Sequence, residues 1–559
     1  MSDTAPEPRP AWFEREPERR DWELEEFAKR GLPATPFERD GLLRVETSLP
    51  FGGKEIDIVV AFPVDYPDSP PDVFGPPVLD RHQVLNPGGG NFCLLEDPAS
   101  DWWPDMSAAQ LVGEDLRWLL EDSERGPEAI VAGQADMPEP ISGHIMYELG
   151  KAMLVPDPFW VLEAPSHGGE VQFVDALPGF SWIATRVDGF EAPDSGLVER
   201  YKANKGSRHV ATWTELTLNV PRWPGHEALL NAAMASDAQI LRRIVKVLDR
   251  ERKRDAAEGW IAVTFVEEGP LLGEKRRMWV FLRVRVFRKG LAQVMGAVRA
   301  QALTPEERAR RIPELVGLGD ARVLVVGAGS LGAPVVFELA KAGVGQIDVV
   351  DHDFYDVNNA VRHVVSTRYA GMRKQDIVVS DTEWLNPFVE IRAHDVKIGG
   401  GASDSVRLDE LFADAAVVVD TTGSQVVTRI LQRRCREQGK TLVVASLTAG
   451  SFGGEVAVFD PGGPCFFCFV LAQDAGDIPT PAAGPRSNMT PVGCSHPAFS
   501  GAGFDATALA ALAARMSICA TRNSEYPQPN YNYVIVNFRG EHPWRQGTLV
   551  ARADCPLCT

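Results

Sequence analysis

Cysteine spacing is the feature of this sequence that points most directly to chemistry. Two Cys-x-x-Cys pairs are present, Cys465/Cys468 and Cys555/Cys558. In each pair the spacing lets two thiolates meet one zinc ion, and two such pairs complete a tetrahedron with no open position. The pairs therefore predict a structural zinc site in the C-terminal part of the chain. The alternative is that each pair acts as a redox dithiol.

Two other cysteines are candidate nucleophiles. Cys494 lies between the pairs in the segment Thr-Pro-Val-Gly-Cys-Ser-His-Pro, where Gly and Pro indicate a loop and His496 could help to form the thiolate. Cys93, in Asn-Phe-Cys-Leu-Leu, follows three glycines that leave its approach open. The alternatives are a fortuitous loop cysteine and a buried structural one. Cys435 and Cys519 lie in helical contexts and are interpreted as packing residues.

A glycine-rich turn precedes the paired cysteines. The sequence Gly-Ala-Gly-Ser-Leu-Gly begins at Gly327, and its context predicts a βαβ unit: strand 323–326, helix 333–342 and strand 346–350. Gly327 permits the tight turn, Gly329 lets the backbone approach phosphate, and Gly332 allows close packing of the helix. Asp351 ends the second strand, where a carboxylate reaches a ribose hydroxyl. NAD, FAD and ATP sites share this pattern.

The polar run after that strand narrows the choice of nucleotide. Asp353, Asn359 and Arg362 follow within twelve residues, and Lys374 comes later. An Arg and a Lys beside a glycine loop can neutralise the charge of a triphosphate, and a dinucleotide dehydrogenase does not need them there. The run therefore favours ATP over NAD. The alternative is a solvated charged loop.

Composition limits the partners. The chain has 559 residues and a net charge of −20, with a pI of about 5.1. Nucleic acid is not an expected partner, because phosphate binding requires clustered Lys and Arg. We interpret no apolar run as a membrane span, and the charged, Pro-rich N-terminus has no signal-peptide pattern. We therefore expect a cytoplasmic protein that does not bind membranes.

The elements group into three domains of an α/β multidomain chain, at 1–140, 141–300 and 301–559. The first reads as helix, strand meander, Pro-rich loop and helix, and the third begins at the helix start Thr-Pro-Glu-Glu. The middle domain carries no chemical motif, and we expect an α/β linker domain. The predicted elements of the first two domains are helices at 22–29, 108–120 and 228–250 and strands at 42–47, 56–62, 210–218 and 279–286.

Residues 304–559 resemble the ubiquitin-activating enzymes and the ThiF/MoeB-type adenylyltransferases. The resemblance implies a Rossmann-like domain that uses ATP and Mg²⁺ to adenylate the C-terminal glycine of a small protein, usually as a homodimer. It implies that Asp351 and Asp353 serve the nucleotide and that Asn359, Arg362 and Lys374 hold phosphates. An Arg of the preceding helix (Arg308, Arg310 or Arg311) would reach the partner protomer. Asp420 would be the magnesium ligand, but the family's second Asp is replaced by Gly423.

Residues 1–140 resemble the ubiquitin-conjugating (UBC) fold. The resemblance rests on the meander, the run Phe-Pro-x-x-Tyr-Pro-x-x-Pro-Pro at 62–71, the Phe-Cys-Leu context of Cys93 and the later Trp-Trp-Pro at 102–104. It implies an α+β domain in which Cys93 carries a thioester. The family's His-Pro-Asn motif is degenerate at His82, so Asn86 or Asn91 would replace its Asn.

The order of the domains resembles bacterial fusions from CBASS antiphage operons and from ubiquitin-like operons. It implies adenylation of a C-terminal glycine, capture by Cys494 in a crossover loop, transthiolation to Cys93 and transfer to a target amine. The acyl donor would be a ubiquitin-like protein or a cyclase-type nucleotidyltransferase. Three alternatives remain: a sulfur-carrier adenylyltransferase, a catalytically degenerate binding scaffold and an NAD oxidoreductase with structural zinc.

Overall fold

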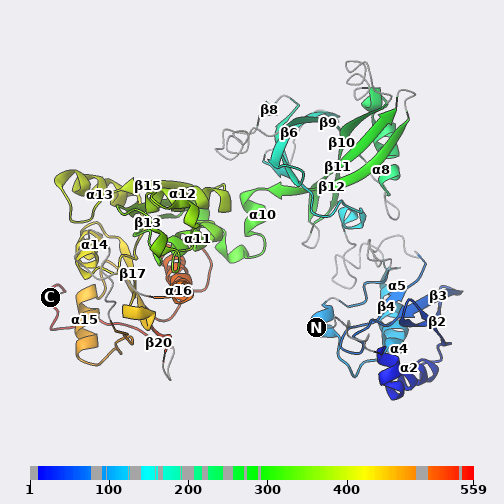
Figure 1. The fold of residues 1–559 in the computed structure, drawn as a ribbon, viewed down its shortest axis with the longest axis horizontal. Coiled ribbons are helices and arrows are strands. Elements are labelled where there is room, and N and C mark those ends of the chain that lie inside the picture. Colours follow the sequence, from blue (N-terminus) through cyan, green and yellow to red (C-terminus); the bar gives the residue numbers. More distant parts are fainter. Residues whose placement is uncertain are drawn as a thin grey trace, which may run out of the picture. The chain divides into compact units, whose positions relative to one another are not determined.

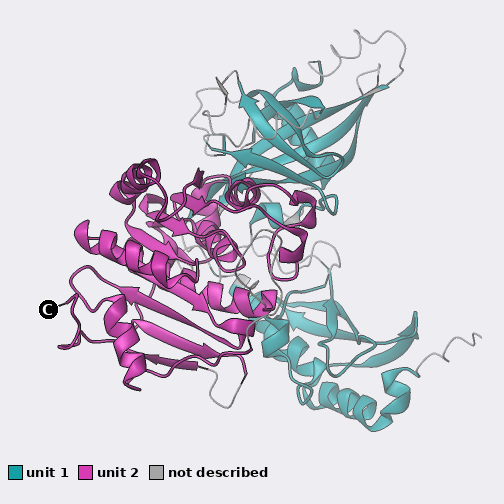
Figure 2. Ribbon diagram, turned by 60° about the vertical axis from the view of Figure 1, so that its left-hand side comes forward, with its two compact units in different colours: residues 1–194, 198–303 teal, residues 195–197, 304–559 magenta. Residues whose placement is uncertain are grey.

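The computed structural model divides the chain into two compact units (Figure 2). One unit holds residues 1–303 without 195–197, and the other holds 304–559 together with 195–197. The described residues are 10–76, 91–95, 97–123, 125, 140–157, 159–160, 168–188, 190–191, 207–216, 225–242, 256–269, 274–287, 291–485, 501–539 and 544–558.

The N-terminal part of the first unit is an antiparallel meander with helices before and after it (Figure 1). In the described residues the sheet order is β1-β2-β3-β4, with β1 Thr35–Arg39, β2 Leu42–Phe51, β3 Lys54–Ala61 and β4 Asp72–Phe74. The helices are α1 Trp12–Arg15, α2 Pro17–Lys29, α3 Pro98–Asp101, α4 Ala108–Gln110, the π-helical segment η1 Leu111–Leu116, and α5 Arg117–Ser123. Strands 42–47 and 56–62 and helix 22–29 are therefore confirmed, although 108–120 is helical only with a π segment inside it.

A buried carboxylate ties this part together. The Glu23 side chain is 1% exposed and accepts hydrogen bonds from Arg19 Nη2 at 2.7 Å, from the Ala108 N–H at 2.9 Å and from the Tyr66 hydroxyl. Burial raises the pKa of Glu23, and these bonds oppose that effect. The network joins α2, the Pro-rich loop and α4, which explains why the rigid segment 63–71 docks on the helices.

The middle part of the first unit is a closed β-barrel. Its described strands are β5 Ala152–Pro156, β6 Gly168–Leu177, β7 Ser181–Val187, β8 Phe190–Glu191, β9 Arg208–Glu215, β10 Ala256–Glu268, β11 Lys275–Phe287 and β12 Ala292–Leu303. They pair in the order β5-β12-β11-β10-β9-β6-β7-β8, and β5 also pairs with β7, which closes the ring. Its interior is filled by aromatic side chains, including Phe173, Trp213, Trp279 and Phe281, so it is a packed core.

The barrel differs from the expected α/β linker. Among the described residues of this part, helix is limited to short segments such as α8, His226–Ser236, and the 3₁₀ turn η2, Ile141–His144. The predicted helix 228–250 is interrupted after Ser236, because Asp237 is extended and its carboxylate accepts the Gln239 N–H, and helix resumes at residues 240–242. Residues 243–250 lie outside the described part. Strand 279–286 is confirmed within β11, and strand 210–218 is confirmed up to Glu215, where β9 ends; residues 217 and 218 lie outside the described part.

The second unit is a mainly parallel sheet with helices on both faces (Figure 1). Its strand order is β15-β14-β13-β16-β17-β18-β19-β20, parallel from β15 to β17 and antiparallel beyond. The described strands are β13 Arg322–Val326, β14 Gln346–Asp351, β15 Glu390–Asp395, β16 Val417–Asp420, β17 Thr441–Leu447, β18 Gly453–Phe459, β19 Tyr533–Asn537 and β20 Trp544–Gly547. The order reverses between β13 and β16, and ligands of such sheets bind at that switch point.

Helices cover both faces of this sheet, because successive side chains along each strand point to opposite faces. In β13, Val323 and Val325 share one core with α11, α12 and α16, whereas Leu324 and Val326 share the other with α13, α14 and α15. The described helices are α10 Pro305–Ala309, α11 Gly332–Ala342, α12 Lys374–Leu385, α13 Ala402–Asp414, α14 Gln425–Glu437, α15 Phe466–Asp474 and α16 Gly503–Thr521. The predicted βαβ unit 323–350 is therefore confirmed to within one residue at each boundary.

Among the described helices, α16 alone is long and apolar enough to cross a membrane by length and composition. However, 56% of its apolar window is buried, and it packs against α11, β17 and β18. It is thus the central core helix of the second unit.

Candidate functional site

The glycine loop joins β13 to α11 at the switch point of the sheet. Gly327 has φ +100°, a left-handed conformation that favours glycine, and its N–H donates to Val350 O at 2.8 Å. A Cβ at Gly332 would lie 1.8 Å from Gly327 O and 2.5 Å from Thr421 Oγ1. A Cβ at Gly329 would meet nothing within 4 Å. Gly327 therefore makes the turn and Gly332 packs closely, while Gly329 leaves open space, where binding of a phosphate stays a prediction.

The carboxylates after β14 are organised by the backbone and by Lys374. Asp351 accepts the N–H of Ala328 at 2.6 Å and that of Asp353 at 2.8 Å, so it fastens the glycine loop to the end of β14. Lys374 Nζ lies 2.8 Å from Asp353 Oδ2, and the backbone N–H of Lys374 donates to Asp353 O at 3.0 Å. Partial burial raises the pKa of Asp353, but the ammonium of Lys374 outweighs it and the pKa is lowered.

His363 is a site residue that the sequence analysis did not single out. It is buried, its Nε2 lies 2.9 Å from Ala328 O, and its Nδ1 accepts the Val365 N–H at 3.4 Å. The two contacts define a neutral ring with the proton on Nε2. Burial lowers the pKa of His363, and the cations Lys374 and Arg362 lower it further. The only trace of it in the sequence is its place directly after Arg362, at the end of the polar run.

Arg362 and Asn359 lie on the segment that follows Asp353. Both are half-buried, and burial lowers the pKa of the Arg362 guanidinium. The first turn of α16 touches this segment, because a Cβ at Gly503 would lie 3.2 Å from both Arg362 Cα and Val361 O. The backbone that carries Arg362 is thus fixed between the glycine loop and α16.

Asp420 is buried rather than turned to the surface. Its side chain accepts the hydroxyl of Thr428 at 2.6 Å, and the hydroxyl and N–H of Thr422 at 2.7 and 3.0 Å. Burial raises its pKa, which these bonds oppose. Asp353, by contrast, leaves 57% of its side chain exposed. Magnesium binding by Asp420 stays a prediction, and its three bonds would compete with the ion.

The arginines of the α10 region are exposed. Arg308 Nη1 lies 3.5 Å from Leu385 O, and Arg310 Nε lies 2.9 Å from Glu307 Oε2. Arg311 is exposed as well. All three side chains therefore lie on the surface. Exposure is a requirement of the predicted role, in which one of these arginines reaches a partner protomer.

The four paired cysteines form one cluster. Their sulfur atoms all lie within 4.8 Å of one another, with Cys465 to Cys555 at 3.5 Å and Cys468 to Cys558 at 3.6 Å. A tetrahedral zinc with bonds of about 2.3 Å separates its sulfurs by about 3.8 Å, so the donor set and spacing fit zinc. Cys465 and Cys468 start α15, and the other pair ends the chain's described part.

The surroundings of the cluster favour thiolate at one position. Arg436 Nη1 donates to Cys558 Sγ at 3.3 Å. Burial raises the pKa of Cys558, but hydrogen bonds from the other three thiols and from Arg436 lower it to about 7. A structural zinc here would join α15 to the C-terminal segment and would receive a hydrogen bond at one sulfur.

The candidate nucleophiles differ in what the structure describes. Cys93 is exposed, and its Sγ lies 4.0 Å from Leu95 O. Its neighbour Phe92 is buried and donates its N–H to Val73 O at 2.7 Å. The interpretation of Cys93 as a buried structural cysteine is therefore wrong. Cys494 and His496 lie outside the described residues, as do His82 and Asn86.

Cys435 and Cys519 are buried, as expected for packing residues.

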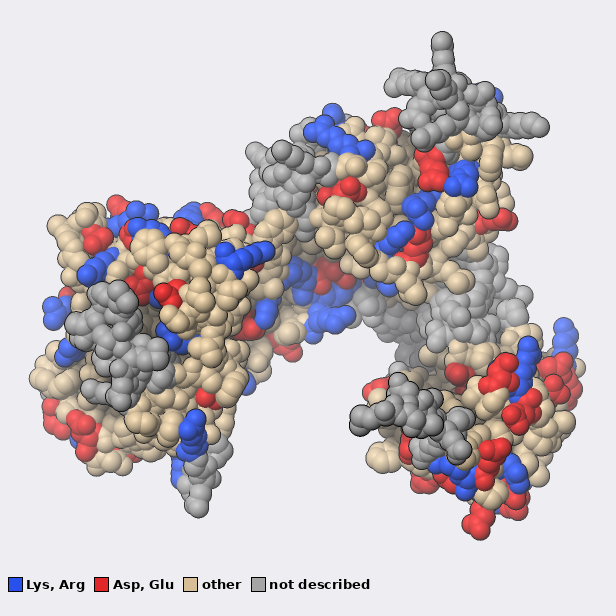
Figure 3. Space-filling model, viewed as in Figure 1, with Lys and Arg blue, Asp and Glu red and all other residues tan. Residues whose placement is uncertain are grey.

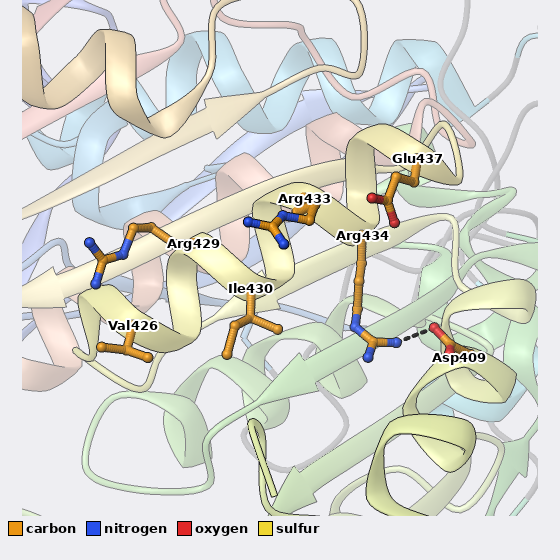
Figure 4. A pocket seen from close by; sticks show the side chains of 7 residues that line it. All are labelled: Asp409, Val426, Arg429, Ile430, Arg433, Arg434 and Glu437. Carbon is orange, nitrogen blue, oxygen red and sulfur yellow. Dashed lines mark hydrogen bonds and ion pairs between the residues drawn. The ribbon is translucent and has the colours of Figure 1, made fainter. Parts of the chain in front are cut away.

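A groove of about 630 Å³ lies along the outer face of α14 (Figure 4). It is lined by Asp409, Val426, Arg429, Ile430, Arg433, Arg434 and Glu437, none of them a predicted site residue.

Comparison with known proteins identifies the second unit. The ThiF family model matches residues 310–552. Those residues form a ThiF-type domain. In the relative named adenylyltransferase and sulfurtransferase UBA4 from Candida glabrata, 35% of 153 residues are identical, covering 27% of this chain and 34% of that protein. The SAMP-activating enzyme E1 of Haloferax volcanii is 33% identical over 178 residues, covering 31% of this chain and 63% of that enzyme.

A third relative extends beyond the ThiF-type domain. Uncharacterized protein y4oA of Sinorhizobium fredii is 27% identical over 582 aligned residues, covering 95% of each chain. The N-terminal and middle parts therefore share sequence with another protein in the same order. The family match and the named relatives together support adenylyltransferase activity in the ThiF-type domain.

Proposed function

We propose that this chain activates the C-terminal glycine of a protein with ATP and passes the acyl group through two cysteines to an amine. The ThiF-type domain forms the acyl-adenylate, Cys494 captures it as a thioester, and Cys93 receives it by transthiolation. An amine of the target protein is the final acceptor. The observation that carries the proposal is an exposed thiol, Cys93, on a separate sheet of a chain that has a ThiF-type domain.

The nucleotide step rests on the geometry around the glycine loop. Asp351 holds the loop at the end of β14, Gly329 leaves open space for a phosphate, and Lys374 and Arg362 supply positive charge. A carboxylate is a poor electrophile because its leaving group would be oxide. AMP is a far better leaving group, so adenylation prepares the carbonyl for attack by a thiol. When bound, ATP with Mg²⁺ would supply that adenylate.

The first thioester rests on the position of Cys494 in the sequence. It precedes Gly503 by nine residues, and Gly503 contacts the backbone of Arg362. Nine residues span at most about 30 Å, so the covalent chain keeps Cys494 within that reach of Gly503. This is compatible with a crossover loop that brings Cys494 to the adenylate.

The proposal includes a setting for the chain. We take the N-terminal sheet to be a UBC-like conjugating domain, and the chain to act in the bacterial cytoplasm as a homodimer with zinc bound at the four cysteines. The resemblance of the domain order to CBASS and ubiquitin-like fusions supports an antiphage or ubiquitin-like role. Having two thiols in one chain raises their effective concentration for transthiolation.

The proposal is tested by ATP–pyrophosphate exchange followed by gel analysis without reductant. A neighbour-encoded protein that ends in glycine should stimulate exchange and form a reducible adduct with the chain. The adduct should move from Cys494 to Cys93, so that Cys93→Ala traps it at Cys494. Absence of both exchange and adduct would contradict the proposal and would leave the scaffold alternative.

A sulfur-carrier adenylyltransferase is the second candidate. The named function of UBA4, adenylyltransferase and sulfurtransferase, favours it for the ThiF-type domain. It gives Cys93 no task, however. In that case Cys93→Ala would leave the yield of acyl-adenylate unchanged, and no acyl group would be found on Cys93 of the wild-type chain.

A further inference from the structure

Helix α14 carries two neighbouring rows of side chains along its groove. Residues four apart lie one above the other on a helix, so Val426 and Ile430 form one row and Arg429 and Arg433 form the next. All four line the groove of about 630 Å³, a volume within the range of ligand sites (Figure 4). The groove therefore has an apolar side and a cationic side.

The two guanidiniums of the cationic row are free to bind a partner. Both side chains are exposed, and no hydrogen bond or ion pair joins Arg429 or Arg433 to any described residue. Arg434, the third arginine of the groove, is engaged differently. It forms an ion pair with Asp409 of α13, and its Nη2 donates to Ser405 Oγ at 2.7 Å (Figure 4). The fold therefore uses Arg434 to hold two helices together and leaves the cationic row to the solvent.

The local charge of the groove is opposite to that of the chain. The chain has a net charge of −20, and acidic and basic side chains are interspersed on the visible face of the second unit (Figure 3). Of the two acidic side chains that line the groove, Asp409 is paired with Arg434, and Glu437 lies one turn beyond Arg433 at the end of α14. Two free guanidiniums then face one carboxylate at the far end, so the groove favours an anionic partner.

The kind of anion follows from the side chains. Every cation of α14 is an arginine, and a guanidinium binds a carboxylate through two parallel N–H···O bonds, which an ammonium cannot do. Arginine is also enriched in protein interfaces, from which lysine is depleted. Sites for single-stranded nucleic acid use aromatic side chains for stacking, and the described lining of the groove has none. The groove therefore suits a protein segment with carboxylates.

The spacing of the rows defines the conformation of that segment. Arg429 and Arg433 are separated by about 6 Å along the helix axis, as are Val426 and Ile430. Alternate residues of an extended chain point to the same side and are about 6.6 Å apart, which nearly matches both rows. An extended segment in which acidic and apolar residues alternate therefore presents its carboxylates to one row and its apolar side chains to the other.

We propose that the groove of α14 binds an extended segment of another protein in which acidic and apolar residues alternate. Arg429 and Arg433 each bind one carboxylate, and Val426 and Ile430 contact the apolar side chains between them. The lined part of the helix, from Val426 to Glu437, is about 16 Å long and accommodates about five extended residues. This interaction is separate from the proposed adenylation and conjugation chemistry and does not rest on it.

The test measures binding of a labelled peptide to the full chain by fluorescence anisotropy. The probe is fluorescein-labelled Asp-Leu-Asp-Leu-Asp, which is compared with a peptide that has Asn for each Asp and with one that has Ser for each Leu. The first peptide should bind saturably, and its affinity should fall as salt is added. Each of the other two should bind at least about fivefold more weakly, because one row of the groove loses its contacts.

Variants of the chain assign the binding to the two rows. Arg429→Ala and Arg433→Ala should each weaken binding of the acidic peptide about fivefold, with Tm unchanged. Ile430→Ser should abolish the preference for Leu over Ser in the peptide and keep the preference for Asp over Asn. Arg545→Ala is the matched control, because it removes the same charge from an exposed position of β20 in the same unit, and it should keep wild-type affinity.

Three results would overturn the proposal. One is a wild-type chain that does not bind the acidic peptide or binds the Asn peptide equally well. Another is wild-type affinity in the double variant of Arg429→Ala and Arg433→Ala. The third is tighter binding of a five-nucleotide oligothymidylate than of the acidic peptide, which would assign the groove to nucleic acid instead.

Discussion

Two glycines of the same loop should respond to alanine in opposite ways. A methyl group at Gly332 would lie 1.8 Å from Gly327 O, and the backbone on both sides would have to move. A methyl group at Gly329 would meet nothing within 4 Å, so the free protein has room for it. That open space is where a phosphate would approach the backbone. Alanine at Gly332 should therefore lower stability, whereas alanine at Gly329 should weaken nucleotide binding and leave stability unchanged.

The magnitudes follow from these contacts. Overpacking of this kind costs about 1–3 kcal/mol, and for a unit of this size each kcal/mol shifts Tm by about 2–4 °C. Gly332→Ala should therefore lower Tm by about 2–12 °C. Gly329→Ala should leave Tm unchanged or raise it slightly, because alanine restricts the unfolded chain. Its affinity for ATP should fall at least about tenfold, which corresponds to about 1.4 kcal/mol.

The assay is thermal unfolding of the full chain with and without ATP, together with ATP titration by calorimetry. Gly329→Ala should lose most of the ATP-dependent rise in Tm while its ligand-free Tm stays at the wild-type value. Wild-type affinity in Gly329→Ala would refute the assignment of the loop as the phosphate site. Unchanged stability in Gly332→Ala would refute the packing role derived from the close contacts.

Three further outcomes are expected. The purified chain should hold one zinc ion, and Cys468→Ser should lose it and unfold at lower temperature. Cys519→Ser changes a buried cysteine outside the cluster and should keep the zinc. Equal metal content in the two variants would contradict the site. Burial lowers the pKa of His363 in the folded protein below its unfolded value of 6.5. The contribution of neutral His363 to the free energy of unfolding is therefore full above about pH 6.5. It is lost as pH falls, at up to about 1.4 kcal/mol per pH unit. His363→Gln should flatten that slope in urea titrations at several pH values, and an identical slope would show that His363 does not titrate there. Glu23→Ala should destabilise the N-terminal part by about 3–5 kcal/mol, because Arg19 loses its buried partner, while Glu25→Ala should have little effect and both should keep ATP–pyrophosphate exchange.

The site in the second unit could be predicted from sequence because its parts are local. Strand, glycine loop, helix and Asp351 follow one another within thirty residues, and each has a distinct pattern. The Cys-x-x-Cys pairs were equally predictable from the sequence, because their spacing is local, and the structure brings all four sulfurs together. His363 escaped notice because a single His carries no spacing signal, and its contact with Ala328 O spans 35 residues.

The middle part was harder to predict for a physical reason. The strand pattern at 279–286 was correct and that at 210–218 was correct up to Glu215, but periodicity within a strand does not show its partners. The barrel closes only because β5 pairs with both β12 and β7, and these pairings join distant segments. Likewise, the bridge of Asn91 with Phe74 joins β4 to a segment that lies apart from it in the sequence.

Mass spectrometry of trapped intermediates tests the central claim most directly. The full chain is incubated with ATP and a glycine-terminated protein encoded beside it, then alkylated without reductant and digested. The account predicts an acyl group on Cys93 in the wild type and on Cys494 in Cys93→Ala. Peptides in which both cysteines are alkylated and neither is ever acylated would contradict it.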